Sequence, residues 1–148
     1  MSAARRRLLI VEDGHEYEEF VRLFLGERFE VRVAHAAAEA TRLAREFQPD
    51  ALLLDLRFER TPADALEGDA DDLAQRRFGG DRARALRHLQ DQQGTIVLAQ
   101  LRAQQCHAPA LFVHDFPARR LANLQQLYGA VHAIPAFDAK AMAQVLGA

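Results

Sequence analysis

Three carboxylates stand directly after two short apolar runs of the chain. Glu12 and Asp13 follow residues 8–11, and Asp55 follows residues 51–54. Runs this short and apolar are typical of strands buried on both faces of a parallel sheet, and α/β sheets form their sites at the carboxyl ends of such strands. Because clustered carboxylates repel one another, they favour a hard cation such as Mg²⁺ between them. The pattern therefore predicts an acidic, metal-binding pocket.

The elements that position these residues alternate along the chain. Strands are expected at residues 8–11, 31–34, 51–54, 110–113 and 130–134, and helices near 15–25, 36–47, 94–105, 117–128 and 138–146. This alternation predicts an α/β fold, a doubly wound five-stranded parallel sheet with helices on both faces and right-handed crossovers.

One long segment interrupts the alternation. More than fifty residues lie between Asp55 and the fourth strand, about twice what a loop and one helix need. We expect an insertion over residues 57–93, in which helices at 69–78 and 81–92 form a hairpin around Gly79-Gly80. Such a hairpin either covers the acidic pocket or offers a docking surface.

Composition limits the classes of function. A chain of 148 residues with 49% hydrophobic content fits a single domain over residues 1–148. A net charge of -2 gives no global reason to expect nucleic-acid or membrane binding. The single cysteine, Cys106, excludes an intramolecular disulfide, and no signal-like or membrane-length apolar segment is present, so the cytoplasm is the expected compartment.

Two motifs resemble those of receiver (CheY-like) domains of two-component response regulators. They are Leu-Leu-Ile-Val-Glu12-Asp13 and Pro49-Asp50-Ala-Leu-Leu-Leu-Asp55, and Gly94, Pro109, Gly129-Ala130 and Pro135 follow in the family's order. The resemblance implies a flavodoxin-like receiver fold and a role in bacterial signal transduction rather than catalysis. It also implies that Asp55 accepts a phosphoryl group from a histidine kinase. Mg²⁺ would then be held by Glu12, Asp13, Asp55 and the backbone carbonyl of Arg57.

Two positions depart from the family pattern. His114 stands where the family has a Ser or Thr, and Ile134 precedes Pro135 where the family has a Lys. Three interpretations of His114 are open. It is a packed histidine at the strand end, a proton-dependent partner of Asp55 or Asp115, or a phosphate contact. The leading hypothesis is an atypical pseudo-receiver whose phosphorylation switching is impaired or absent.

Two alternatives stay open. One is a phosphorylation-competent receiver in which an arginine replaces the lysine, drawn from Arg57, Arg60, Arg76, Arg77 and Arg82. The other is a small Mg²⁺-dependent phosphatase-like enzyme.

The expected output is a protein–protein contact, with a histidine kinase or a downstream effector as partner, or with a second copy in a homodimer. The resemblance places the usual surface on the last two helices and the fifth strand. Its exposed residues would be Arg119, Arg120, Gln125, Gln126 and Lys140. The hairpin in residues 57–93 is the second expected surface.

Overall fold

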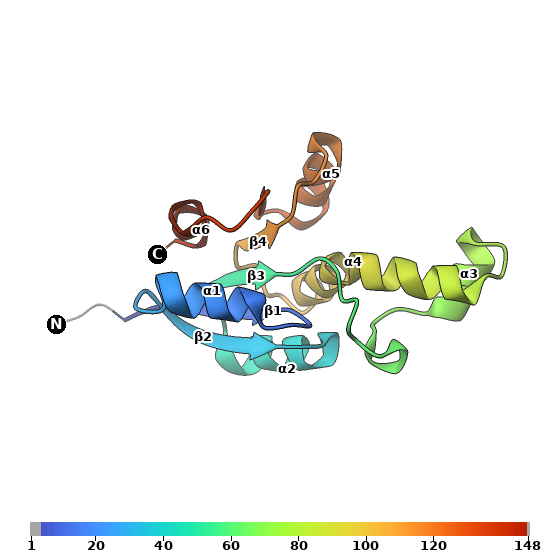
Figure 1. Ribbon diagram of the computed structural model, residues 1–148, viewed down its shortest axis with the longest axis horizontal. Coiled ribbons are helices and arrows are strands. Elements are labelled where there is room, and N and C mark those ends of the chain that lie inside the picture. Colours follow the sequence, from blue (N-terminus) through green and yellow to red (C-terminus); the bar gives the residue numbers. More distant parts are fainter. Residues whose placement is uncertain (1–3, 148) are drawn as a thin grey trace.

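The computed structural model describes residues 4–147 and contains one five-stranded sheet. The strands are β1 (Arg6–Val11), β2 (Phe29–Ala34), β3 (Ala51–Leu54), β4 (Ala110–Val113) and β5 (Val131–Ile134). All neighbouring strands are parallel, in the order β2-β1-β3-β4-β5 (Figure 1). The predicted fold class is therefore confirmed. β2 begins two residues earlier than expected because Phe29 pairs with Arg6 of β1.

Helices cover both faces of the sheet. They are α1 (Glu16–Leu25), α2 (Ala37–Phe47), α3 (Ala70–Arg77), α4 (Arg82–Ala103), α5 (Ala118–Tyr128) and α6 (Ala139–Leu146), with a 3-10 turn η1 (Ala63–Ala65). Leu8 and Ile10 of β1 face the layer of α1 and α6, whereas Leu9 and Val11 face the layer of α2, α4 and α5. This two-sided burial explains why the strand is continuously apolar. None of the helices of residues 4–147 is both long and apolar enough to cross a membrane.

The hairpin differs from the sequence prediction in one respect. α3 lies within the expected range, and Asp69 and Asp81 cap α3 and α4 by accepting hydrogen bonds from the third amide of each helix. The predicted break near residue 93 is wrong, since α4 is one continuous helix of 22 residues. Its first half and α3 extend beyond the sheet (Figure 1). Gly94 lies in the middle of α4 because it permits a close contact, and it does not end a helix.

The chain between β3 and α3 is fastened to the middle of α4. The Phe58 N–H donates to the carbonyl of Gln90 (2.8 Å), and the Gly94 N–H donates to the carbonyl of Leu56 (2.9 Å). The fully buried side chain of Gln93 accepts from the Glu67 N–H (2.7 Å) and donates to the Glu67 carbonyl (3.1 Å). The path of the segment that leaves Asp55 is thus fixed by α4.

Replacement of Gln93 by Met should release this segment. Met keeps most of the side-chain volume but loses the paired bonds to Glu67, at a cost of about 1–3 kcal/mol in the free energy of unfolding. Hydrogen exchange should show faster exchange over residues 56–69, measured beside urea unfolding. Gln100→Met is the matched control, because Gln100 lies on the same helix and is half-buried, away from Glu67. Equal protection in both variants would contradict the assignment.

Candidate functional site

Asp13 and Asp55 lie together at the carboxyl edge of the sheet. Val11 pairs with Leu54 across β1 and β3, and the Asp55 N–H donates to the Val11 carbonyl (2.8 Å). The pKa of Asp55 is raised to about 7, chiefly by burial and next by the charge of Asp13, although the Arg57 backbone N–H acts against the rise. Burial and the neighbouring Asp13 carboxylate thus both favour the protonated form of Asp55.

Glu12 binds the first turn of α1, and its role as a metal ligand stays a prediction. Its fully buried carboxylate accepts from the backbone N–H groups of Tyr17 (3.0 Å) and Glu18 (2.8 Å) in the first turn of α1. Burial raises the pKa of Glu12, and these two amides act against the rise. Because His15 at the N-cap makes no side-chain cap, Glu12 supplies acceptors for the free amides of the helix.

The charge of Glu12 still contributes to the raised pKa of Asp55, so the three carboxylates interact. Within residues 4–147, no group of three His, Cys, Asp or Glu side chains is placed to hold a metal ion. The pair of Asp13 and Asp55 still suits Mg²⁺, because that ion usually binds protein through one or two carboxylates and keeps several waters. The backbone carbonyl of Arg57 is the further ligand that the receiver resemblance implies.

The segment after β3 passes over this acid pair. The Arg60 N–H donates to the Asp13 carboxylate (2.6 Å), and the exposed Arg60 guanidinium donates to Glu16 (3.0 Å). The Glu16 carboxylate raises the pKa of Arg60, with smaller contributions from Asp13 and Asp55. Among the five arginines considered as replacements for the lysine, Arg60 therefore interacts electrostatically with the carboxylates of the pocket.

The side chains of the other four arginines interact with other groups. Arg76 pairs with Asp72 (3.3 Å) and Arg82 with Asp71 (2.9 Å), both on the hairpin. Burial lowers the pKa values of His114 and His88, and the positive charges of Arg57 and Arg77, respectively, lower them further.

His114 and Ile134 are both packed against apolar neighbours. The half-buried His114 ring contacts Phe116 edge-on at 4.7 Å between centroids, and Phe116 contacts Phe112 in the same way. Burial lowers the pKa of His114, Arg57 lowers it further, and Asp115 opposes them. Ile134 is half-buried in the layer of α1 and α6. These surroundings favour the reading of His114 as a packed, neutral strand-end histidine.

Tyr17 is a site residue that the sequence reasoning missed. Its hydroxyl donates to the carbonyl of Val113 (3.3 Å) at the end of β4, and burial followed by the charge of Asp55 raises the pKa of Tyr17. The sequence does contain a pattern that indicates Tyr17. Val21 and Leu25 follow it by four and eight residues, so all three side chains lie on the buried face of α1. A hydroxyl on an otherwise apolar helical face calls for a buried acceptor.

The predicted partner surface is divided between two helices. Arg119, Arg120, Gln125 and Gln126 lie on α5, and Lys140 lies on α6 in the opposite layer. Gln125 donates to the Val131 carbonyl (3.0 Å), and Arg120 donates to Gln92. Arg119, Gln126 and Lys140 are exposed.

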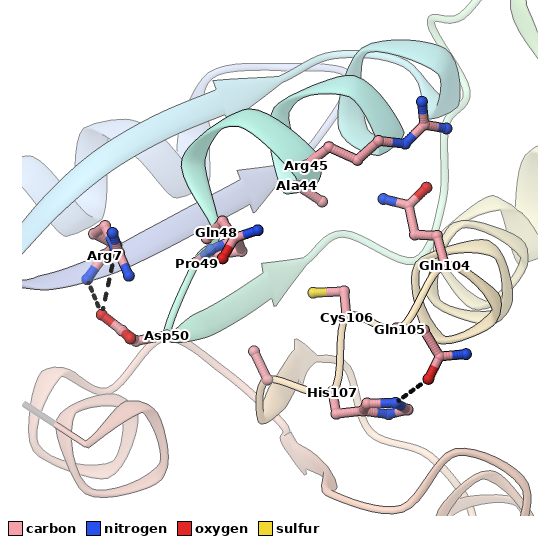
Figure 2. A pocket seen from close by; sticks show the side chains of 11 residues that line it. Arg7, Ala44, Arg45, Gln48, Pro49, Asp50, Gln104, Gln105, Cys106 and His107 are labelled. Atoms are coloured by element: carbon pink, nitrogen blue, oxygen red, sulfur yellow. Dashed lines mark hydrogen bonds and ion pairs between the residues drawn. The ribbon is translucent and has the colours of Figure 1, made fainter.

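A separate cavity of about 390 Å³ opens at the other edge of the sheet (Figure 2). Arg7 and Asp50 line it and pair with each other at 3.7 Å, and Cys106 and His107 line its other side. Asp50 precedes β3 and Asp55 follows it, so this cavity is remote from the acid pair.

Comparisons with known proteins agree with this architecture. No protein-family model and no curated protein sequence matches the chain. Solved structures do match it over 97% of its length. The receiver fold is the fold of this chain. One similar structure is the signal receiver domain of a Luxo repressor protein from Vibrio parahaemolyticus, with 14% identity, a TM-score of 0.66 and 88% of that chain covered.

Two further receiver-fold structures are similarly close. The chemotaxis protein CheY4 of Vibrio cholerae has 16% identity and a TM-score of 0.65 over 98% of its chain. The signal receiver domain of a modulated diguanylate cyclase from Desulfovibrio desulfuricans has 20% identity and a TM-score of 0.61 over 92% of its chain. These likenesses establish the receiver fold, and the chemistry of the site depends on its own residues.

The raised pKa of Asp55 predicts a pH-dependent effect of Asp55→Asn. The folded state binds the Asp55 proton more tightly than the unfolded chain, so this stabilisation is complete below about pH 4 and lost as pH rises through about 7. In metal-free buffer Asn should therefore stabilise the fold at pH 8, by about 1–3 kcal/mol after allowance for solvent screening. Urea unfolding between pH 4 and 8 measures this. A difference that does not change with pH would contradict it.

Gly94→Ala should destabilise the receiver fold despite the better helix propensity of alanine. A Cβ at this position would overlap the carbonyl oxygen of Asp55 and lie 2.9 Å from the Leu56 Cα. Overpacking against backbone costs about 1–3 kcal/mol, which exceeds the propensity gain of about 1 kcal/mol in most of that range. Urea unfolding gives the sign directly, and a more stable variant would show that α4 does not approach β3 this closely.

Proposed function

We propose that this receiver-fold chain is a signalling domain that acts through contacts with a protein partner and whose response to phosphorylation is impaired or absent. The main support is the hydrogen bond from the Arg60 N–H to the Asp13 carboxylate, which ties the segment after β3 to the acid pair. Gln93 and Gln90 hold the same segment to α4, so it does not leave the pocket freely. A kinase domain approaching Asp55 must displace it.

The surroundings of Asp55 also lack the groups that bind a phosphoryl oxygen in typical receivers. Ile134 offers no polar side-chain atom, and His114 is kept neutral by its burial and by Arg57. Each missing charge-assisted contact is worth about 1.5–3 kcal/mol. If Mg²⁺ binds, Asp13, Asp55 and the Arg57 carbonyl would hold it, and the ion would offset the negative charge of the pair and of a phosphoryl group.

We further infer that residues 57–93 are an addition to the receiver fold that supplies partner-binding surface. α3 and the first half of α4 extend beyond the sheet (Figure 1), and their buried residues Ala70, Ala74, Ala85 and Leu89 prolong the core of the α2–α4–α5 layer. The α5 surface with Arg119 and Gln126, and Lys140 on α6, is the second candidate surface. A histidine kinase, a downstream effector or a second copy of the chain would bind there.

A second candidate is a phosphorylation-competent receiver in which Arg60 replaces the missing lysine. The position of its guanidinium favours this, because Arg60 is exposed, bonded to Glu16 and within the field of Asp55. An arginine released from Glu16 could present two parallel N–H groups to phosphoryl oxygens.

Intact-mass measurement after incubation with acetyl phosphate and Mg²⁺ separates the two candidates. The leading proposal expects no phosphoryl adduct on the wild type and none on Asp55→Asn. A wild-type adduct that Asp55→Asn abolishes would overturn it. Loss of that adduct in Arg60→Gln, with retention in the surface control Arg45→Gln, would establish the second candidate.

A further inference from the structure

A groove of about 430 Å³ runs between the hairpin and α5, away from the acid pair. Leu73 of α3 and Leu89 and Ile96 of α4 form its apolar floor. Arg77 at the last turn of α3, His88 of α4 and Arg120 of α5 form its polar rim. The groove exists because α4 begins well before it reaches the sheet and α3 packs back on it. It is therefore built by α3 and α4 together with α5.

The rim carries positive charge that no internal acid neutralises. Among residues 4–147, neither Arg77 nor Arg120 has a carboxylate oxygen within 4.0 Å, whereas the neighbouring Arg76 and Arg82 are both paired. After burial, Arg77 and Arg120 both lower the pKa of His88, and Asp91 opposes them only in part. Two permanently charged arginines thus line one groove, where their mutual repulsion is a cost and the charged form of His88 is disfavoured. A bound anionic group would remove that cost.

Arg120 is also held in place without being neutralised. Its guanidinium donates to the side-chain oxygen of Gln92 and lies 5.7 Å from the centroid of the Phe116 ring. Both contacts orient the guanidinium, and neither supplies a negative charge. Less side-chain entropy is therefore lost when an acidic partner binds it.

The apolar floor of the groove indicates that its ligand also carries an apolar surface. Leu73 and Ile96 are half-buried, so each leaves apolar surface in the open groove. A groove that is open along its length suits a peptide segment better than a small molecule, which binds in an enclosing cavity. An apolar floor beside a basic rim complements a helix with one apolar stripe and flanking carboxylates.

We propose that the groove between α3, α4 and α5 binds an acidic amphipathic helix of a partner protein, with the apolar stripe on Leu73 and Ile96 and the carboxylates on Arg77 and Arg120. The inference rests on the proposed function, because it names the partner chemistry of a domain that signals by protein contacts. It does not require phosphorylation of Asp55.

A labelled synthetic helix tests this directly. The probe is a fluorescein-labelled peptide of Leu, Ala and Glu with leucines at i, i+3, i+4 and i+7, and its control is a scrambled peptide of the same composition. Fluorescence anisotropy at low salt should show binding of the striped peptide and at least tenfold weaker binding of the scrambled one. Equal binding of both peptides would reduce the effect to general charge attraction and overturn the proposal.

Charge reversal identifies the groove. Arg77→Glu combined with Arg120→Glu should weaken binding of the striped peptide at least tenfold, with circular dichroism confirming that the variant is folded. Arg28→Glu combined with Arg45→Glu makes the same change in net charge on other surfaces and should leave the affinity within about twofold. Absence of binding to the wild type, or equal loss in both double variants, would overturn the proposal.

Asp55→Asn separates this inference from the proposed function. The variant should bind the striped peptide as tightly as the wild type does, without phosphodonor or Mg²⁺. Failure of the groove assay leaves the mass measurements on Asp55 unaffected, and a phosphoryl adduct on Asp55 leaves the groove assay unaffected.

Discussion

The contact between Gly94 and the backbone of Asp55 determines how the rest of this receiver fold is arranged. Without a Cβ at residue 94, α4 lies directly against the end of β3, and the chain leaving Asp55 is hydrogen-bonded to the helix through Leu56 and Phe58. That chain then runs along α4 to Glu67, where Gln93 holds it. The segment that leaves Asp55 and the hairpin beyond it both depend on this glycine-dependent approach.

Local patterns were sufficient for the sheet and for the position of the acid pair. Residues 8–11 and 51–54 are apolar throughout because each strand is buried on both faces, and a carboxylate after such a run has few other places to lie. The predicted helix boundary beside Gly94 was wrong, because the role of this glycine depends on the backbone of Asp55, which is distant in sequence. In isolation, a glycine within a helical pattern equally indicates a break.

The roles of Glu12 and Arg60 depend on which backbone N–H group binds which carboxylate. The order of residues along the chain does not reveal this. Both oxygens of Glu12 accept hydrogen bonds from backbone amides in the first turn of α1. Asp13 meets a backbone N–H contributed by Arg60, 47 residues away, and any residue type except proline could supply that donor. The composition of the acidic pocket was thus predictable, and the assignment of each carboxylate to its partner was not.

The continuity of α4 has a mechanical consequence. About 12 residues separate its first turn from Gly94, so roughly 18 Å of helix projects from the point where α4 touches β3. When a rigid helix tilts about a point near its middle, displacement increases with distance from that point. A tilt of about 5° would move the α3 end by about 1.5 Å and would hardly displace Asp55. α4 therefore has the geometry of a lever whose fulcrum lies beside the acid pair and whose long arm carries α3.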